Sequence, residues 1–592
     1  MCIAGYLSVN MVDENKISLL KQIKKELSCK ESDYNDIAIL NNVAMINTDS
    51  SDISEKKLHF QTLKFLNLFI VFTGKIYNKI DIKTELLLKG YDFKTDFEEE
   101  LLIKAYHYFG QDIILKLDGN FVFAIWDSDK ETLLVARDRF GMKPLYYKLT
   151  VHECWFSSNL PILVKNTSDD IKINYSAIQS YFYMQSVVPP PDTLIEEYSK
   201  LDSGMYIVFS FSKDHKKILK KEVKYYMHSV LHNEKIEDEK DIIRKIKKMM
   251  INSIEKRILY NKNIINWLSG GLDSSLISAI CYKELGIKLD SLSVGFDDIN
   301  YNDGNEFEYS RYVNRLYSKE HQEILISNNQ ICDELYNSLD FLNEPMISND
   351  YIGHYIMGKI TSKQNIGMAL SGLGADEVFY GYDWHMKYIN KKNLDISKLI
   401  MKTCFEYDMN AIKQFLNSEF LNININEDYL NRYHYDKNNS NFNNLVAFNL
   451  NMIMVEDPIK RANTVEMSNG IDILSPYLDN DLVDYSLSVP NSIKLKNNIG
   501  KYILKKIALE YFDKDFVFRP KTHFEVPIIK YTEGKVKDMC KDILLSSKCI
   551  NRGLYNKKFI DTLVNNKQEI TNLGGNLLWE LTVLEYWLSK II

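Results

Sequence analysis

The chain has 592 residues, of which 45% are hydrophobic and 26% charged, and its formal net charge is -7. This length exceeds what one hydrophobic core serves, so we expect roughly two to four globular domains. The acidic balance argues against nucleic acid as a partner. No run of about 18 uncharged apolar residues occurs, and residues 1–10 lack secretory-signal features, so we expect a cytoplasmic protein without a membrane partner.

The eight cysteines form no CxxC pair and no Cys/His cluster at metal-ligand spacing. Such spacing would be needed for a structural zinc site, and a cytoplasmic protein keeps its thiols reduced. The sequence therefore predicts neither disulfides nor zinc.

The first 210 residues read as strands with a few helices. Segments 69–78, 120–127 and 132–138 are rich in β-branched and aromatic residues and are bounded by Gly, Asp or Asn. They predict layered β-structure in a domain spanning 1–210. Removal of Met1 would make Cys2 the first residue, and its α-amino group, with a pKa of about 8, could then act as base for its own thiol. Cys2 is thus a candidate catalytic nucleophile.

Residues 211–240 are polar and charged, which is typical of an exposed connection between domains. From 241 to 592 the pattern changes. A long helical segment, 241–258, is followed by short strands at 264–268 and 289–296 and by further helices. This alternation predicts βαβ units and a parallel sheet in a second domain, 241–592, which becomes mostly helical after about residue 390.

A glycine-rich turn, Ser269-Gly270-Gly271-Leu272-Asp273-Ser274-Ser275, joins the strand 264–268 to the helix 274–285. Adjacent glycines allow the backbone to approach an anion, and the N–H groups and dipole of a helix start favour negative charge. The turn predicts a pyrophosphate site. It lacks the GxxxxGK[ST] pattern and the lysine of a Walker A loop.

A second Ser-Gly turn lies in residues 370–382 (LSGLGADEVFYGY) and follows another apolar strand. If the two turns lie at the carboxyl ends of neighbouring strands, Asp273 and Asp376 approach the same phosphates. Carboxylates together with phosphate oxygens are the ligands that Mg²⁺ requires. The sequence therefore predicts Mg²⁺ held by Asp273 and Asp376.

The string SGGLDSS resembles the pyrophosphate loop of ATP pyrophosphatases. Further segments in the order expected for asparagine synthetases support it: 291–296 with Lys319-Glu320-His321, the second turn, SPYLD at 475–479, Gly500-Lys501-Tyr502 and 519–527. The resemblance covers about residues 240–592 and implies an α/β ATP-pyrophosphatase (adenine nucleotide α-hydrolase-like) fold. It implies that a carboxylate is activated as its adenylate, with release of AMP and pyrophosphate, and that Lys501 is catalytic. The ATP contacts it implies are Leu268, Ser269, Gly270, Gly271, Asp273, Ser274, Val294, Ser371 and Gly372.

Residues 118–147 resemble the class II glutamine amidotransferase domain, which implies an αββα fold of the Ntn-hydrolase type with Cys2 as nucleophile. The glutamine site departs from the family. The opening MCIAG is one glycine short of MCGIAG, and the NGEIYN segment reads Thr73-Gly74-Lys75-Ile76-Tyr77-Asn78. Glu98 lies where the family has an SDxE pair. No arginine precedes Arg137, although the family binds the glutamine carboxylate with one. Thr73, Gly74, Lys75 and Glu98 thus resemble a remnant of a glutamine site.

The acceptor half also departs from the family, since Leu373 occupies the position of a glutamate or, in β-lactam-forming relatives, a tyrosine. An apolar side chain cannot take a proton from an amine. Three functions remain open: an adenylating amide ligase without efficient glutaminase activity, as in β-lactam or lasso-peptide macrolactam synthetases; a glutamine-hydrolysing asparagine synthetase; or a silent scaffold. The partners expected are ATP, Mg²⁺ and a small-molecule or peptide carboxylate. The amine donor (glutamine, ammonia or a substrate amine) and a homodimer are left open.

Overall fold

The computed structural model describes residues 2–27, 37–48, 64–168, 170–230, 238–259, 263–296, 307–391, 395–421, 433, 436–520, 526–530, 532–566, 570–571 and 573–592. The chain forms two compact units. The first comprises mainly Met1–Asn174 and Pro190–Met227, and the second mainly Tyr175–Pro189 and His228–Lys590. None of the described helices is long and apolar enough to cross a membrane.

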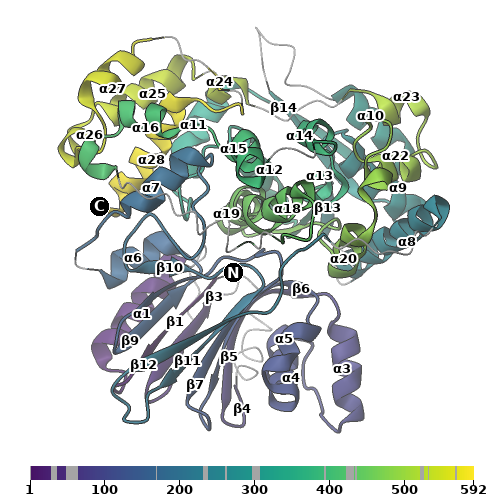
Figure 1. The fold of residues 1–592 in the computed structure, drawn as a ribbon. Coiled ribbons are helices and arrows are strands. Elements are labelled where there is room, and N and C mark those ends of the chain that lie inside the picture. The colour runs from purple at the N-terminus through teal and green to yellow at the C-terminus, as the bar shows by residue number, and fades with distance from the viewer. Residues whose placement is uncertain are drawn as a thin grey trace. The chain divides into compact units, whose positions relative to one another are not determined.

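Two six-stranded antiparallel sheets form the centre of the first unit (Figure 1). One has the order β10-β8-β9-β1-β3-β2 and the other β12-β11-β7-β6-β5-β4. The strands are β1 (Cys2–Ser8), β2 (Ile37–Ile39), β3 (Val43–Thr48), β4 (Lys64–Phe65), β5 (Leu68–Ile76), β6 (Gly119–Asp127), β7 (Thr132–Arg137), β8 (Tyr146–Leu149), β9 (Glu153–Ser157), β10 (Tyr198–Lys200), β11 (Met205–Phe211) and β12 (Ile218–Lys224). The strands predicted at 69–78, 120–127 and 132–138 are confirmed as β5, β6 and β7.

Apolar side chains of the two sheets pack against each other, as Ile3 and Met45 do with Val71 and Val122. The other face of the β5–β7 sheet packs on helices, where Leu86 and Leu102 meet Phe121. Those helices are α3 (Lys79–Leu88), α4 (Glu98–Phe109) and α5 (Ile113–Lys116), and α1 (Glu14–Leu27) and α6 (Leu160–Thr167) pack on the β1 sheet. The predicted αββα layering is confirmed.

Part of the stretch 211–240 forms the edge strand β12, which pairs with β11 over its whole length. Its sequence ILKKEVK places charges on an edge, where they discourage pairing with another chain. This is why the segment reads as an exposed connection in the sequence. The domain boundaries at 210 and 240 stay a prediction.

A five-stranded parallel sheet, ordered β15-β14-β13-β16-β17, forms the centre of the second unit and confirms the predicted parallel sheet. Its strands are β13 (Ile264–Trp267), β14 (Asp290–Phe296), β15 (His321–Ile326), β16 (Met368–Leu370) and β17 (Asp472–Leu474). The helices that come shortly before these strands in the chain are α8 (Glu239–Ile258), α9 (Leu272–Lys283), α10 (Phe307–Tyr317), α11 (Asn328–Leu339), α12 (Tyr351–Lys363) and α19 (Lys460–Asn469).

The other regular elements of this unit are mostly helices, and those after residue 390 agree with the prediction (Figure 1). These helices are α7 (Tyr175–Tyr183), α13 (Ala375–Phe379), α14 (Asp383–Tyr388), α15 (Ile396–Cys404), α16 (Met409–Phe415), α18 (Asn441–Phe448), α20 (Asn480–Ser488), α21 (Asn491–Lys494), α22 (Tyr502–Ala508), α23 (Lys514–Phe518), α24 (Pro527–Lys530), α25 (Gly534–Leu544), α26 (Ser547–Arg552), α27 (Lys557–Leu563) and α28 (Leu577–Ile591). Between α18 and α19 the helix widens into two π-helical turns, Asn449–Ile453 and Val455–Ile459.

Candidate active site

The first Ser-Gly turn joins β13 to α9, as its sequence predicts. Gly270 has a φ of +85° and passes so close to α10 that an added Cβ would lie 2.8 Å from the Ser310 nitrogen, so only glycine fits. Ser269 Oγ accepts a hydrogen bond from the Gly271 N–H at 3.1 Å and lies 3.1 Å from Ser274 Oγ. These bonds hold the turn in a compact shape in front of the α9 N-terminus.

The second turn follows β16, which is the immediate neighbour of β13 in the sheet. A Cβ added to Gly372 would lie 2.9 Å from the Asp273 Cβ, so the two turns nearly touch. The Leu373 N–H donates to Ser371 Oγ at 3.3 Å, and Ser475 Oγ donates to the Leu373 carbonyl. The sequence correctly placed the two turns at one edge of the sheet.

Lys501 joins the two turns. Its Nζ lies 2.6 Å from Asp273 Oδ2 and 2.9 Å from Asp376 Oδ1. Burial opposes the charged form of Lys501, but the two carboxylates outweigh it and raise the lysine pKa. The lysine backbone has a φ of +53°, and Gly500 before it passes so close that an added Cβ would lie 2.6 Å from the Tyr380 carbonyl oxygen. Gly500 is therefore required by the backbone geometry, whereas Lys501 adopts a left-handed conformation that residues other than glycine rarely take.

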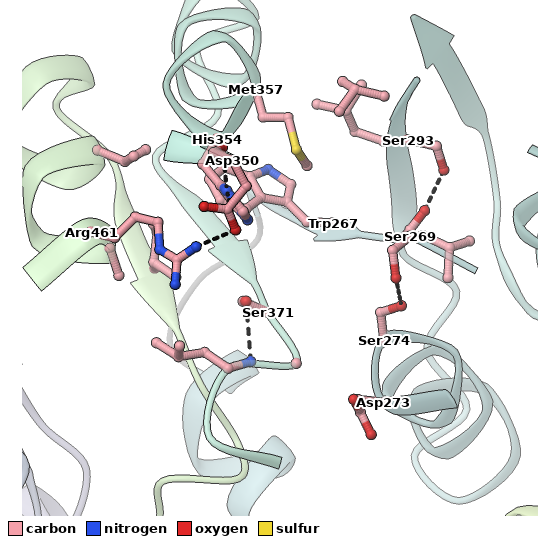
Figure 2. Close-up of a pocket in the computed structure, with 18 of the residues that line it drawn as sticks. Trp267, Ser269, Asp273, Ser274, Ser293, Asp350, His354, Met357, Ser371 and Arg461 are labelled. Atoms are coloured by element: carbon pink, nitrogen blue, oxygen red, sulfur yellow. Dashed lines mark hydrogen bonds and ion pairs between the residues drawn. The ribbon is translucent and has the colours of Figure 1, made fainter. Parts of the chain in front are cut away.

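Two cavities meet at these turns. The smaller has a volume of about 290 Å³ and is lined by most of the residues predicted to bind ATP: Leu268, Ser269, Asp273, Ser274, Val294, Ser371 and Gly372. Figure 2 shows Ser269, Ser274 and Ser371 on its walls, with Trp267 and Met357 among its apolar surfaces. Gly271, Asp273, Asp376 and Lys501 line a larger cavity of about 1010 Å³. Gly270 lines neither of these two, but its carbonyl accepts a hydrogen bond from Arg519.

The larger cavity can accommodate a magnesium-bound polyphosphate. Among the described residues no group of three or more His, Cys, Asp or Glu side chains could hold a metal by itself. Mg²⁺ commonly binds through one or two carboxylates, with substrate phosphates and water completing its shell. A Cβ on Gly381 would lie 1.9 Å from Asp376 Oδ1 and 2.2 Å from Lys501 Cε, so this glycine keeps the space between the charged groups open. Asp273 and Asp376 fit such an ion.

A second charged group, which the sequence analysis missed, lies where the cavities meet. Arg461 forms an ion pair with Asp350 (Figure 2), donates to Ser348 Oγ at 3.0 Å and lies 3.6 Å from Asp457. Burial opposes the charge of Arg461, but Asp350 and Asp457 outweigh it and raise its pKa. The four-residue spacing of Asp457 and Arg461 on one helix was the available signal. The partner Asp350 is 111 positions away in sequence.

Leu373 lines the smaller cavity, next to Ser371 and Gly372. An apolar side chain therefore lines this cavity at the position where the family pattern has a glutamate or a tyrosine. Lys505 and Arg519 add positive charge to the larger cavity. Burial lowers the pKa of Lys505, and the neighbouring Lys501 charge lowers it further.

In the first unit, Cys2 begins β1 and is 4% exposed. Its backbone N–H donates to Thr48 Oγ1 on β3 at 3.0 Å. The other predicted residues belong to the opposite sheet or its helices: buried Thr73 and Gly74 and half-buried Lys75 lie on β5, and Glu98 begins α4. Gly74 has a φ of +131°, and an added Cβ would lie 1.9 Å from the Asn120 oxygen.

Lys75 and Glu98 influence each other electrostatically. Burial raises the Glu98 pKa, and the Lys75 and Lys79 charges oppose that rise. Lys79 Nζ lies 3.9 Å from Glu98. The structure therefore brings Lys75 and Glu98, both altered relative to the family pattern, into one charged cluster with Lys79.

The guanidinium of Arg137, the first arginine in the sequence, is held by the protein itself. Its Nε, Nη1 and Nη2 donate to the backbone carbonyls of Lys143, Leu201 and Gly141 at 2.7, 2.6 and 2.7 Å. With the side chain 4% exposed, Arg137 has a structural role in the turn after β7. The glutamine carboxylate anchor that the sequence lacks before this position is not replaced by Arg137.

Comparison with known proteins gives consistent results for both units. Residues 245–589 match the model of asparagine synthase, and residues 1–226 match that of the glutamine amidotransferase domain. The chain is 25% identical to asparagine synthetase [glutamine-hydrolyzing] 1 of Bacillus subtilis, covering 88% of this chain and 85% of the relative. It is 22% identical to asparagine synthetase [glutamine-hydrolyzing] 3 of the same species, covering 84% and 82%, and 22% identical to the mouse enzyme, covering 78% and 72%. The chain therefore belongs to the asparagine synthase family, whose members are ATP-using carbon–nitrogen ligases.

Proposed function

We propose that this enzyme activates a carboxylate other than that of aspartate as its acyl-adenylate and joins it to an amine, without efficient hydrolysis of glutamine. The observation that carries the adenylation step is the contact of Lys501 with both Asp273 and Asp376 at the junction of the Ser-Gly turns. This site concentrates one ammonium and two carboxylates beside a cavity large enough for the phosphates of ATP.

In this proposal the adenosine occupies the smaller cavity, and the β and γ phosphates lie in the larger one. A carboxylate oxygen attacks the α-phosphorus, and pyrophosphate departs with the electron pair of the broken P–O bond. Lys501 stabilises the charge that develops on the phosphates. Mg²⁺, when bound by Asp273 and Asp376, would neutralise phosphate charge. The amine nitrogen then attacks the acyl carbon, the acyl C–O bond breaks with its electron pair leaving on AMP, and the proton lost by the amine passes to water.

Two observations support the proposal that the carboxylate substrate and the amine donor differ from those of asparagine synthetases. Leu373 itself supplies no acid or base at its position in the second turn. In the first unit the family asparagine is Thr73 and the family glutamate is Lys75, and each of the three guanidinium nitrogens of Arg137 donates to a backbone carbonyl. Bidentate recognition of a carboxylate needs a free arginine fork, which lysine reproduces poorly.

A second candidate function is glutamine-dependent asparagine synthesis. It is favoured by the matches of both domain models and by the names of the relatives. Under this alternative Cys2 would release ammonia from glutamine, and aspartate would be the adenylated carboxylate.

One assay separates the two. Purified enzyme is incubated with ATP, Mg²⁺ and a panel of carboxylates that includes aspartate, with glutamine, ammonium or no added amine, and AMP, pyrophosphate, glutamate and asparagine are measured. The proposal predicts AMP and pyrophosphate with a carboxylate other than aspartate and little glutamate. Asparagine formed at high rate from aspartate and glutamine would instead establish the second candidate.

A further inference from the structure

Two glutamates, the half-buried Glu406 and the buried Glu580, lie together behind the wall of the larger cavity. Glu406 Oε1 and Glu580 Oε1 lie 2.7 and 2.5 Å from the point that a Cβ on Gly575 would occupy, so the two carboxyl groups face the same small volume. Glu580 is 1% exposed. These residues lie 174 positions apart in sequence order and have no part in the adenylation proposed above.

We propose that Glu406 and Glu580 share a proton, and that this pair is a positioning element that holds Gln185 and the loop 573–576 at the wall of the larger cavity. Gln185, Leu573, Gly574, Gly575 and Asn576 all line that cavity. Neither glutamate lines it.

The hydrogen bonds of the pair lead directly to this wall. Gln185 Nε2 donates to Glu406 Oε2 at 2.5 Å and to the Leu573 carbonyl at 3.1 Å. The Glu406 backbone N–H donates to the Tyr183 carbonyl at 2.7 Å, at the end of α7. On the other side, Tyr407 donates its hydroxyl proton to Glu580 Oε1 at 3.2 Å.

No positive charge compensates the pair within the part of the chain that the structure describes. The groups that influence the two carboxyls there are each other, Tyr407, Gln185 and backbone N–H groups, with Tyr181 donating to the Glu580 carbonyl. Glu406 Oε1 and Glu580 Oε2 are buried and accept no hydrogen bond from any described residue. Two adjacent buried carboxylates cannot both keep their charge, because desolvation and mutual repulsion both disfavour it. One proton retained by the two carboxyl groups lowers the charge of the pair and so reduces both the desolvation cost and the repulsion.

The direction of the pH dependence follows. Burial raises the Glu406 pKa from 4.5 to about 7 and raises that of Glu580 further, with the Glu406 charge adding to the effect. A folded-state pKa above the unfolded value gives stability that is fully present below pH 4.5 and is lost as pH rises through the folded pKa. Because the two groups interact, they titrate as a pair, and the loss spreads over a range of pH that begins near neutral.

The test uses the full-length enzyme and its Glu406→Gln and Glu580→Gln variants, with Glu419→Gln at an exposed position as control. Glutamine has the shape of a protonated glutamate and cannot ionise. Melting temperature is measured from pH 5 to pH 9, and hydrogen exchange of the peptide that contains residues 573–576 is followed at each pH after correction for intrinsic rates.

We expect the native enzyme and the control to lose several degrees of melting temperature as pH rises, with faster exchange in 573–576. In each glutamine variant the decline and the faster exchange should be at least halved. Infrared difference spectra of native enzyme minus Glu580→Gln at pH 7 should show a protonated carboxyl. Parallel pH profiles in all four proteins, or no protonated carboxyl in the native spectrum, would overturn the proposal. If one of the two variants does not fold, the pH profile and the infrared difference spectrum of the other variant still decide.

Discussion

The ammonium nitrogen of Lys501 lies 2.6 Å from Oδ2 of Asp273 and 2.9 Å from Oδ1 of Asp376. The three residues come from the first Ser-Gly turn, the second Ser-Gly turn and the N-terminus of α22. Their charges sum to -1 before any substrate binds. Lys501 therefore holds two carboxylates in place that would otherwise repel each other.

Replacing Lys501 with alanine should slow pyrophosphate exchange by roughly 10²–10³-fold, the cost of one lost charge-stabilising group. Because the carboxylates raise the Lys501 pKa, the lysine stays charged from pH 6 to pH 9 and the native rate should show no titration from it. Isotope exchange between labelled pyrophosphate and ATP measures this directly. If the Lys501→Ala variant exchanges pyrophosphate at the native rate, Lys501 has no part in the reaction.

The apolar side chain of Leu373 should make the native enzyme a poor producer of asparagine from aspartate and ammonium. Leu373→Glu should restore an acid beside Ser371 and raise asparagine formation, with at most a small change in the rate with the enzyme's own carboxylate. Product analysis by mass spectrometry checks both statements, and Leu373→Met serves as the apolar control. Abundant asparagine from the native enzyme would contradict them.

If the glutamine site lacks its carboxylate anchor, as proposed, Cys2→Ala should leave the ligase reaction unchanged. Misplacement of a bound substrate by about 1 Å can cost roughly 10²-fold, and Thr73 and Lys75 alter the site further. Glutamate release from glutamine, and labelling of Cys2 by a glutamine-mimicking electrophile, are the measurements. Glutamate release that depends on Cys2 and increases with ATP would show that the first unit still supplies ammonia.

How much of this could be read from the sequence depends on distance along the chain. The strand-turn-helix order around Ser269 and the second turn was predictable, because the glycines and the apolar strands are local signals. The ion pair of Asp350 with Arg461 and the pairing of Glu406 with Glu580 were not, because each joins segments brought together only by tertiary packing. The edge strand β12 was missed because its lysines outweigh its apolar residues in the sequence pattern.

Lys494 gives a stability prediction away from the reaction. It is 0% exposed, its Nζ has no hydrogen-bond partner among the described residues, and it lies 4.2 Å from the centre of the Tyr380 ring. Burial lowers its pKa from 10.5 to about 7. The unfolded chain therefore holds the proton more tightly between pH 7 and pH 10.5, and stability rises with pH across that window.

Lys494→Met should therefore raise the melting temperature, by more at pH 6 than at pH 10, since methionine fills similar space without a charge. Thermal unfolding followed by circular dichroism at the two pH values measures the difference. Lys398→Met, at an exposed position on α15, is the control. A variant that is less stable than the native enzyme at pH 6 would show that Lys494 is held charged by a favourable contact.

Attack of a carboxylate on the α-phosphorus of ATP, at the site of Asp273, Asp376 and Lys501, transfers one carboxylate oxygen to AMP. The enzyme is therefore supplied with the accepted carboxylate labelled with ¹⁸O, and the label is located in the products by mass spectrometry. We expect AMP to carry one ¹⁸O atom and pyrophosphate none, and Asp273→Asn to slow AMP release by roughly 10²–10³-fold. Formation of ADP with the ¹⁸O in orthophosphate would contradict this expectation.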